Sequence, residues 1–380
     1  MRILFLLVFV ITLHSCEQKP VVKTSLEFND VPRLQVPVKT PVVSNKDLLY
    51  LKTHFDKFIK RRRFNGSIVI AKNNEIIYDT TLGYANVRRR IPLEDTSAIQ
   101  LASITKPITS AVILSLIQEG KLNLEDTVTS FLPRLPESYK KITIKMLLSH
   151  QSGLTQYYYY CDHVLENKKC VVSNDSLIEI INCHNPGFAG RPGRRFNYCN
   201  TNFALLASVA EHLEGKSFQE IIQERIIEPS GMKNSFLLDL SKESLPKNLV
   251  YGNSEWNKVM EFDYLDGIVG DKGFFSTAHD LLLFDKYFFS CLMVTDSMLQ
   301  AAFEPQVKIK NNGNSYGLGW RLRFDKDLGK IIYHPGWWRG NRHLYFKIPS
   351  KDYTVIMLSN SIKGSRYNLN DLLAVFNDVE

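Results

Sequence analysis

The chain has 380 residues, of which 44% are hydrophobic and 23% charged, and it carries a formal net charge of +8. This composition is ordinary for a folded protein, and the length allows a large core in one or two domains. The basic clusters do not interleave with aromatic residues as a nucleic-acid surface would, so we expect solvated faces and no nucleic-acid partner. These clusters are Arg61–Arg63, Arg88–Arg90 and Arg191/Arg194/Arg195.

The first residues, "MRILFLLVFVITLHSC", have the pattern of an export signal. Arg2 provides a positive start, and residues 3–13 are almost all apolar. That apolar run is too short to span a bilayer, which needs about 20 residues. We therefore predict that residues 1–15 are a signal peptide.

The segment ends in a sequence that resembles a bacterial lipoprotein cleavage site, in which Cys16 becomes the lipidated N-terminus. His14 departs from the small residue usual there, so simple signal cleavage stays an alternative. We expect an exported lipoprotein that is anchored in a bacterial membrane and faces the periplasm or the cell surface. Residues 16–45 are polar and rich in proline, which predicts a flexible tether before one folded domain at 46–380.

Five cysteines follow Cys16, and export would expose them to oxidising conditions. Cys161 and Cys170 flank a short polar segment and are the easiest pair to close, while the odd count leaves at least one cysteine over. A zinc site is conceivable with four ligands: Cys161, His163, Cys170 and Cys183. This spacing matches no compact ligand pattern, and exposed thiols would tend to oxidise, so we expect no metal.

The expected elements place strands at both ends of the chain. A helix over 47–59 is followed by a hairpin over 66–86 with its turn at Asn73-Asn74. Residues 103–300 are mainly helical, including 200–215 and 217–231, and Thr277 with Asp280 has the spacing of a helix cap. Strands return after residue 315, and a helix follows at 368–378. We predict an α+β fold: one antiparallel sheet from both chain ends, flanked by helices, with a helical insertion lobe and a cleft between the lobes.

A Ser-x-x-Lys pattern, which can supply a nucleophile and its base, occurs four times. Ser230/Lys233 lies in a Pro–Gly turn, Ser244/Lys247 encloses a proline, and Ser138/Lys141 belongs to a polar connection. Only Ser103/Lys106 opens a long apolar helix, "SITKPITSAVILSLIQEG", whose first turn would aim backbone N–H groups at the reacting centre. A lysine at the end of a buried helix is costly unless it is paired or deprotonated. Local evidence therefore favours Ser103 and Lys106 without deciding between catalysis and chance.

Two further motifs follow in order. Tyr198-Cys199-Asn200 ends a Pro/Gly loop just before a helix, which can direct loop residues into a cleft, although Asn200 or Asn202 could simply cap that helix. His334-Pro335-Gly336 lies in a β-run, where a glycine often marks close backbone approach. A lone histidine near a strand end is more often structural than catalytic.

Together these motifs resemble the serine β-lactamase and penicillin-binding superfamily, in particular its class C-like branch of D-alanyl-D-alanine carboxypeptidases, β-lactamases and esterases. Further segments over roughly 46–375 share the likeness: "FNGSIVIAKNNEIIYDTTLGYAN", "LLSHQSGL", "EPSGMKNS" and "GIVGDKGFFSTAHDLLLF". The resemblance implies that Ser103 is acylated, that Lys106 or Tyr198 is the general base, and that Tyr198 relays the proton to the leaving group. It also implies that Asn200, His334, Gly336 and Trp337 bind substrate, with the N–H groups of Ser103 and Trp337 forming an oxyanion hole if the third motif lies on an edge strand.

Two departures weaken the case for penicillin. His334 replaces the lysine of many β-lactamases and would hold a substrate carboxylate less firmly, while Pro335 offers neither a hydroxyl nor an N–H. Trp337, Trp338 and the tyrosines at 157–160 would form an aromatic wall or would simply pack. We expect a serine hydrolase that cleaves an amide or ester, a D-alanyl peptide or small ester before a β-lactam. The alternative is a catalytically silent binding lipoprotein of the same fold. The resemblance implies a small-molecule or peptide substrate, and no motif implies a cofactor.

Overall fold

The computed structural model describes residues 43–379, except 167, 310–312 and 366. The expected signal peptide 1–15, the lipidation site Cys16 and nearly all of the tether 16–45 lie outside the described residues. Within the described part of the chain, no helix combines the length and apolarity that crossing a membrane requires.

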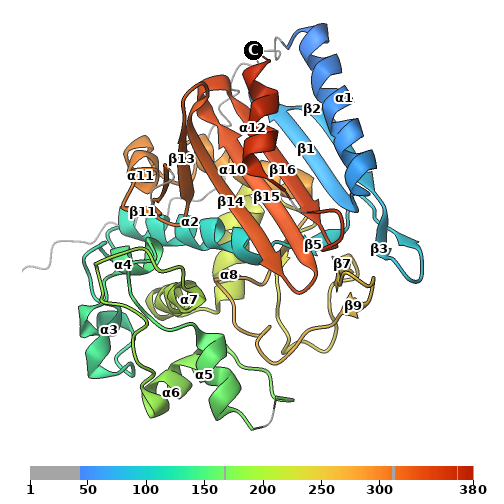
Figure 1. Ribbon diagram of the computed structural model, residues 1–380. Coiled ribbons are helices and arrows are strands. Elements are labelled where there is room, and N and C mark those ends of the chain that lie inside the picture. Colours follow the sequence, from blue (N-terminus) through green and yellow to red (C-terminus); the bar gives the residue numbers. More distant parts are fainter. Residues whose placement is uncertain (1–42, 167, 310–312, 366, 380) are drawn as a thin grey trace, which may run out of the picture. The chain divides into compact units, whose positions relative to one another are not determined.

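The centre of the fold is an antiparallel eight-stranded sheet in the order β11-β12-β13-β14-β15-β16-β1-β2 (Figure 1). Its strands are β1 (Gly66–Lys72), β2 (Glu75–Leu82), β11 (Val307–Ile309), β12 (Asn314–Tyr316), β13 (Arg321–Asp325), β14 (Gly329–Trp338), β15 (Asn341–Ile348) and β16 (Tyr353–Ser359). Gly66 of β1 lies opposite Ser359 of β16, so the two ends of the chain pair directly. The predicted sheet from both ends is confirmed.

The N-terminal hairpin also forms as predicted. Asn73 and Asn74 have φ angles of 50° and 67°, and the left-handed conformation of two consecutive residues is what a tight two-residue hairpin turn requires. Helix α1 (Asn45–Arg62) precedes it and is longer than expected at both ends, because Ser44 caps it and the left-handed Arg63 stops it.

Helices cover both faces of the sheet, and β1 shows why. Ile68 and Ile70 point to a core shared with α1 and with α12 (Leu369–Asn377), whereas Val69 points to a core shared with α2 and α10. Alternate residues of a strand face opposite sides, so a strand that is apolar throughout needs cover on both. Figure 1 shows α1 and α12 on one side of the sheet and α2 and α10 behind it.

The middle of the chain forms the helical part. Its helices are α2 (Thr105–Gln118), α3 (Val128–Phe131), α4 (Ile144–Leu148), α5 (Tyr157–Val164), α6 (Asn174–His184), α7 (Asn200–Glu214), α8 (Phe218–Ile222), α9 (Glu228–Ser230), α10 (Ala278–Phe289) and α11 (Asp296–Ala302). Shorter turns are the 3-10 helices η2 (Ala102–Ile104), η3 (Glu137–Lys141) and η5 (Pro349–Lys351) and a π-helical turn over Gln223–Ile227.

Short strands, β3 to β10, also form outside the large sheet, and those after residue 103 were not expected from the helical pattern. A small sheet has the order β6-β10-β5-β7, and β3 pairs with β4 and β8 with β9. These strands are only two or three residues long, too short for a periodic signal. They are β3 (Tyr84–Asn86), β4 (Ile91–Pro92), β5 (Ala98–Gln100), β6 (Phe236–Leu237), β7 (Leu249–Val250), β8 (Gly252–Asn253), β9 (Val259–Met260) and β10 (Phe274–Ser276).

The predicted cap of α10 is half correct. Thr277 Oγ1 accepts a hydrogen bond from the N–H of Asp280 at 3.1 Å, as a cap should. The Asp280 carboxylate, however, accepts from the N–H of Asn234 at 2.7 Å and the hydroxyl of Ser235 at 2.8 Å. Asp280 therefore holds the loop around Asn234 and Ser235 against the start of α10 through these hydrogen bonds.

Cys161 and Cys170, the pair that is easiest to close from the sequence, do not form a disulfide. Cys161 is a free, buried thiol on α5, whereas Cys170 is exposed. Burial raises the pKa of the Cys161 thiol to about 12, which suppresses the thiolate needed for exchange. Among the described residues, no group of three His, Cys, Asp or Glu side chains is arranged to hold a metal ion.

Candidate active site

Ser103 lies in η2, directly before α2. The preceding residue, Ala102, is buried and has a φ of 49°, a conformation that costs a residue with a Cβ and that is often found at functional sites. Ser103 is partly exposed. Its position places the serine and the residue three further on along the same side of the helix start.

Lys106 contacts Ser103 directly. The Lys106 side chain is fully buried, and its Nζ donates to Ser103 Oγ at 3.0 Å and to the backbone oxygen of Asp271 at 2.9 Å. No ion pair forms at Lys106 among the described residues. In the other three Ser-x-x-Lys pairs, which all lie in the described part of the chain, no hydrogen bond joins serine to lysine.

The carbonyl that holds Lys106 belongs to a tightly packed loop. Gly270 and Gly273 flank it with φ angles of 99° and 97°, and a Cβ on Gly270 would lie 2.4 Å from the backbone oxygen of Phe203. The buried Lys272 donates to the carbonyls of Leu265 and Ile268 at 2.8 Å each, and to the hydroxyl of Tyr157 at 3.0 Å. The loop therefore has little freedom to move away from Lys106.

Tyr198 lies beside the same lysine. The Nζ of Lys106 is 5.0 Å from the centroid of the Tyr198 ring. The side-chain amide of Gln156 fixes the backbone here, since it donates to the Tyr198 carbonyl and accepts from the N–H of Asn200, both at 2.8 Å. The structure thus brings Ser103, Lys106 and Tyr198 together from two distant parts of the chain.

His150, which belongs to the segment "LLSHQSGL" and has no catalytic pattern of its own in the sequence, packs against Tyr198. Its ring centroid is 4.3 Å from that of Tyr198, and its Nδ1 accepts from the N–H of Cys199 at 3.1 Å. Burial, followed by the charges of Lys106 and Arg321, holds the pKa of His150 well below its usual range. A neutral ring with Nδ1 unprotonated fits this bond.

Asn200 is the first residue of α7, and neither it nor Asn202 caps the helix. The N-cap is Cys199, without a side-chain bond, and the Asn202 amide bonds to Leu147 and Ser152 instead. The Oδ1 atom of Asn200 is buried and has no partner among the described residues. A buried acceptor without a hydrogen bond is uncommon in a folded protein.

The His-Pro-Gly motif lies on β14, which is an inner strand of the sheet rather than an edge strand. Pairing with β13 nevertheless ends at Tyr333, so residues 334–338 have a partner only in β15. Pro335 has no N–H, so it fits this strand when its nitrogen faces away from β15. Trp337 lies two residues further along the strand, so its N–H points to the same side as the proline nitrogen. The end of β14 therefore presents a local edge, and η2 packs there.

Gly336 forms the contact between β14 and the nucleophile segment. A Cβ at this position would lie 2.5 Å from the backbone oxygen of Leu101 and 2.8 Å from a ring carbon of His343. The missing Cβ therefore lets β14 approach the segment just before Ser103. Trp337 next to it is 68% exposed.

His334 is fully buried, unlike a residue that faces substrate directly. Its Nδ1 lies 2.8 Å from the Pro335 carbonyl and its Nε2 lies 3.1 Å from the Tyr316 hydroxyl. Because a carbonyl only accepts, Nδ1 carries the proton and Nε2 accepts from Tyr316. Burial, then the charges of Arg321 and Lys106, hold the pKa of His334 well below its usual range, so the ring is neutral.

The aromatic residues considered for a wall differ in how deeply they are buried. Tyr157 and Tyr160 are buried in the core, while Tyr159 and Trp337 are exposed. Trp338 is partly buried, and its Nε1 donates to Asp266 at 2.7 Å. Packing therefore explains two of the four tyrosines.

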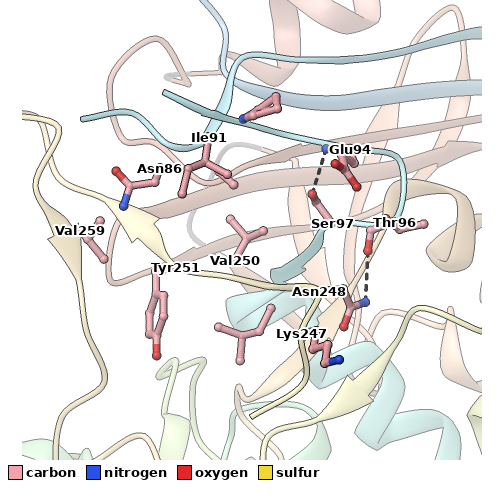
Figure 2. Close-up of a pocket in the computed structure, with 13 residues that line it drawn as sticks. Asn86, Ile91, Glu94, Thr96, Ser97, Lys247, Asn248, Val250, Tyr251 and Val259 are labelled. Atoms are coloured by element: carbon pink, nitrogen blue, oxygen red, sulfur yellow. Dashed lines mark hydrogen bonds between the residues drawn. The ribbon is translucent and has the colours of Figure 1, made fainter. Parts of the chain in front are cut away.

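A cavity of about 540 Å³ lies between the β3–β4 hairpin and the segment that carries β7 to β9 (Figure 2). Its polar groups bond to one another, for example Ser97 Oγ to the N–H of Glu94 at 2.9 Å and the Asn248 amide to the Thr96 carbonyl at 3.1 Å. None of the sequence-predicted site residues lines it, so it is separate from the Ser103 centre.

The fold and this serine–lysine centre define the class of serine hydrolases that includes penicillin-binding proteins. The Beta-lactamase family model matches residues 51–377. The chain is 31% identical over 342 residues to penicillin-binding protein 4* of Bacillus subtilis, covering 84% of this chain and 73% of that protein. The chain belongs to the Beta-lactamase family.

Two further comparisons are less close in sequence. A D-aminopeptidase of Cereibacter sphaeroides is 25% identical over 80% of this chain, which spans 58% of that enzyme. The octameric penicillin-binding protein homologue of Pyrococcus abyssi superposes with a TM-score of 0.72 at 26% identity, over 86% of this chain and 78% of that one. The predicted fold class is confirmed, as is the resemblance.

Proposed function

We propose that the protein is a serine hydrolase that cleaves an amide or ester through an acyl-enzyme at Ser103. The observation that carries this proposal is the 3.0 Å contact between Lys106 Nζ and Ser103 Oγ inside a buried site. A serine hydroxyl reacts only when a base takes its proton, and this amine is within reach of it.

In this mechanism Ser103 Oγ attacks the substrate carbonyl while its proton passes to Lys106 or Tyr198. The negative charge that develops on the carbonyl oxygen is met by the N–H groups of Ser103 and Trp337. Tyr198 then delivers the proton to the leaving group and afterwards helps to activate water. Asn200, through its unpartnered Oδ1, accepts from an N–H of the substrate.

The substrate class follows from the neutral His334 and from Pro335. Without the ammonium and hydroxyl common at these positions, a D-alanyl peptide or a small ester fits better than a β-lactam. The comparison proteins named as penicillin-binding proteins and as a D-aminopeptidase favour hydrolysis over the silent-binding alternative.

The test is active-site labelling with a fluorophosphonate or a fluorescent penicillin, read by intact mass. We expect Ser103→Ala to abolish both labelling and turnover, and Ser138→Ala, in another Ser-x-x-Lys pair, to retain both. Labelling that survives in Ser103→Ala, or a wild-type protein that never labels at any pH, would overturn the proposal. Rates on a chromogenic cephalosporin, p-nitrophenyl butyrate and a D-Ala-D-Ala peptide then order the substrates.

We also propose that the protein is exported and lipidated at Cys16, on the evidence of residues 1–16 alone. In a bacterial host, we expect the mature N-terminus to be a diacylglyceryl-modified Cys16, and Cys16→Ser to release the protein from membranes. An unmodified N-terminus would show simple signal cleavage instead.

A further inference from the structure

The positive charge of the chain is concentrated at the start of the folded domain. Residues 43–63, which are α1 and its flanks, contain seven Lys and Arg and two acids, a net charge of +5. Residues 64–380 contain 35 Lys and Arg and 34 acids, a net charge of +1. Because the excess charge lies on one element rather than over the whole surface, it indicates an anionic partner at that element.

The two acids of α1 do not neutralise its cations. Asp47 is buried, and Asp56 accepts from Lys52 Nζ and from the hydroxyl of Tyr78, both at 2.9 Å. The other basic residues of the helix are exposed and form no ion pair within the part of the chain that the structure describes: Lys46, Lys57, Lys60, Arg61 and Arg62. A helix C-terminus attracts cations, which accounts for those in the last turn but not for Lys46 and Lys57.

A groove of about 530 Å³ lies between α1 and α12, which cover the same face of the sheet (Figure 1). Its α1 side is one face of that helix, with residues spaced three and four apart: His54, Lys57, Phe58, Arg61 and Arg62. Asn368, Asp371 and Leu372 line the other side, and Asp371 already accepts from the Asn368 amide at 3.2 Å. Three cations without an ion pair therefore lie beside two apolar side chains, which suits a ligand that joins a negative group to an apolar one.

Helix α1 also exposes apolar surface next to its cations. Leu49 is 67% exposed, and it shares the outward face of the helix with Lys46 and Lys57. A face of basic residues with an exposed leucine is typical of helices that lie at the surface of an anionic membrane. The helix begins at Asn45, 29 residues after Cys16, and a flexible tether of that length spans about 30 Å. A lipid on Cys16 would therefore keep α1 close to a bilayer.

Helix α1 and the nucleophile lie on opposite faces of the large sheet. Phe55 of α1 packs in the same core as Ile68 of β1, whereas Leu101, just before Ser103, packs in the core that contains Val69. Ile68 and Val69 are neighbours in one strand and point to opposite sides of it. A surface that holds α1 therefore leaves Ser103 on the far side of the sheet.

We propose that α1 and the groove beside it are a membrane-docking surface that binds the phosphate head groups of anionic phospholipids and turns the Ser103 site away from the bilayer. Guanidinium and ammonium groups pair with phosphate, and Leu49 enters the boundary between head groups and acyl chains. The inference goes beyond the proposed hydrolase, and it does not require a lipid on Cys16 because the surface belongs to the folded domain. Substrate then reaches the docked enzyme from the side away from the membrane.

The test is co-sedimentation of the mature chain carrying Cys16→Ser, which cannot be lipidated, with two kinds of vesicle. One is phosphatidylcholine alone and the other contains about 30% phosphatidylglycerol, both in about 0.15 M salt. We expect binding to the anionic vesicles only. Each Lys or Arg near the surface contributes a factor of about five, so Lys57→Gln/Arg61→Gln/Arg62→Gln should bind about 100-fold more weakly. Leu49→Ser should weaken binding by about 10-fold without a change in charge.

Arg88→Gln/Arg89→Gln/Arg90→Gln is the matched control, because it removes the same charge from an exposed cluster outside α1. It should bind as the wild type does. Equal binding of the wild type to both vesicles, or to neither, overturns the proposal even if the α1 variant does not fold. An equal loss in the two triple variants overturns it as well, since net charge would then be responsible. Binding to soluble polyphosphate but not to anionic vesicles would assign the groove to an anionic polymer instead.

Labelling of Ser103 separates this inference from the proposed hydrolase. Vesicle-bound protein should label as fast as free protein, and slower labelling on vesicles overturns the orientation. If anionic vesicles bind and Ser103 never labels, the hydrolase fails and the docking surface stands. If Ser103 labels and no anionic vesicle is bound, the docking surface fails and the hydrolase stands.

Discussion

Replacing Gly336 with alanine tests the geometry of the whole site by adding one methyl group. The new Cβ would lie 2.5 Å from the backbone oxygen of Leu101, about 0.9 Å inside the 3.4 Å at which ordinary contact begins. Its second neighbour is a ring carbon of His343 at 2.8 Å, and that ring is fixed by a 2.7 Å bond to the Gln100 carbonyl. Neither neighbour is the free end of a flexible side chain, so β14 and η2 have to move apart.

The displacement of β14 from η2 in Gly336→Ala sets the expected losses of stability and of turnover. Overpacking a buried site typically costs about 1–3 kcal/mol of folding stability, which lowers the Tm by a few degrees. An opening of roughly 0.9 Å also carries the N–H of Trp337 beyond the ~3 Å reach of an oxyanion donor. We therefore expect kcat to fall by about 10²–10³, the usual cost of losing one such donor.

The assay is turnover of p-nitrophenyl butyrate together with thermal unfolding followed by circular dichroism. Gly187→Ala is the matched control, because a Cβ there meets nothing within 4 Å. It should leave both kcat and Tm as in the wild type. Wild-type turnover by Gly336→Ala would refute the placement of Trp337 in the oxyanion hole, whatever happens to the Tm.

Two further predictions concern buried groups around the site. His343 is fully buried, and desolvation lowers its pKa to about 4. As the pH drops from about 6.5 toward 4, the unfolded chain therefore binds a proton before the folded chain does, and the free energy of unfolding falls by about 3 kcal/mol in full. Urea unfolding at pH 7 and 4.5 should show a smaller loss of stability in His343→Gln than in the wild type, and an equal loss in both proteins would contradict this assignment. Lys272→Met leaves two backbone carbonyls and the Asp271 carboxylate without their cation, and we expect roughly 3–5 kcal/mol of destabilisation. Lys247→Met, at an exposed lysine, is the control. A wild-type Tm in Lys272→Met would show that the loop does not depend on this lysine.

Local patterns were enough to predict much of the fold. The β1–β2 hairpin depends on Asn73 and Asn74, and the start of α10 on Thr277, so neighbouring residues decide these features. The short strands β5 to β10 could not be predicted, since two or three residues carry no period and pair only because distant segments meet. The pairing of Cys161 and Cys170 could not be decided for a related reason: sequence separation says nothing of burial, and Cys161 is buried on α5.

The sequence by itself determined the chemistry available to this protein: a serine and a lysine three residues apart at the start of an apolar helix, followed by the Tyr198 and His334 motifs. Only the tertiary structure decided which groups surround Ser103. Arg321 and Asp271 lie far from it along the chain and carry no local signal, yet the end of β13 and the Gly270–Gly273 loop bring them to Tyr198 and Lys106. The same packing buries His334 as a neutral ring, because transferring a charged imidazole into that environment costs more than its two hydrogen bonds return.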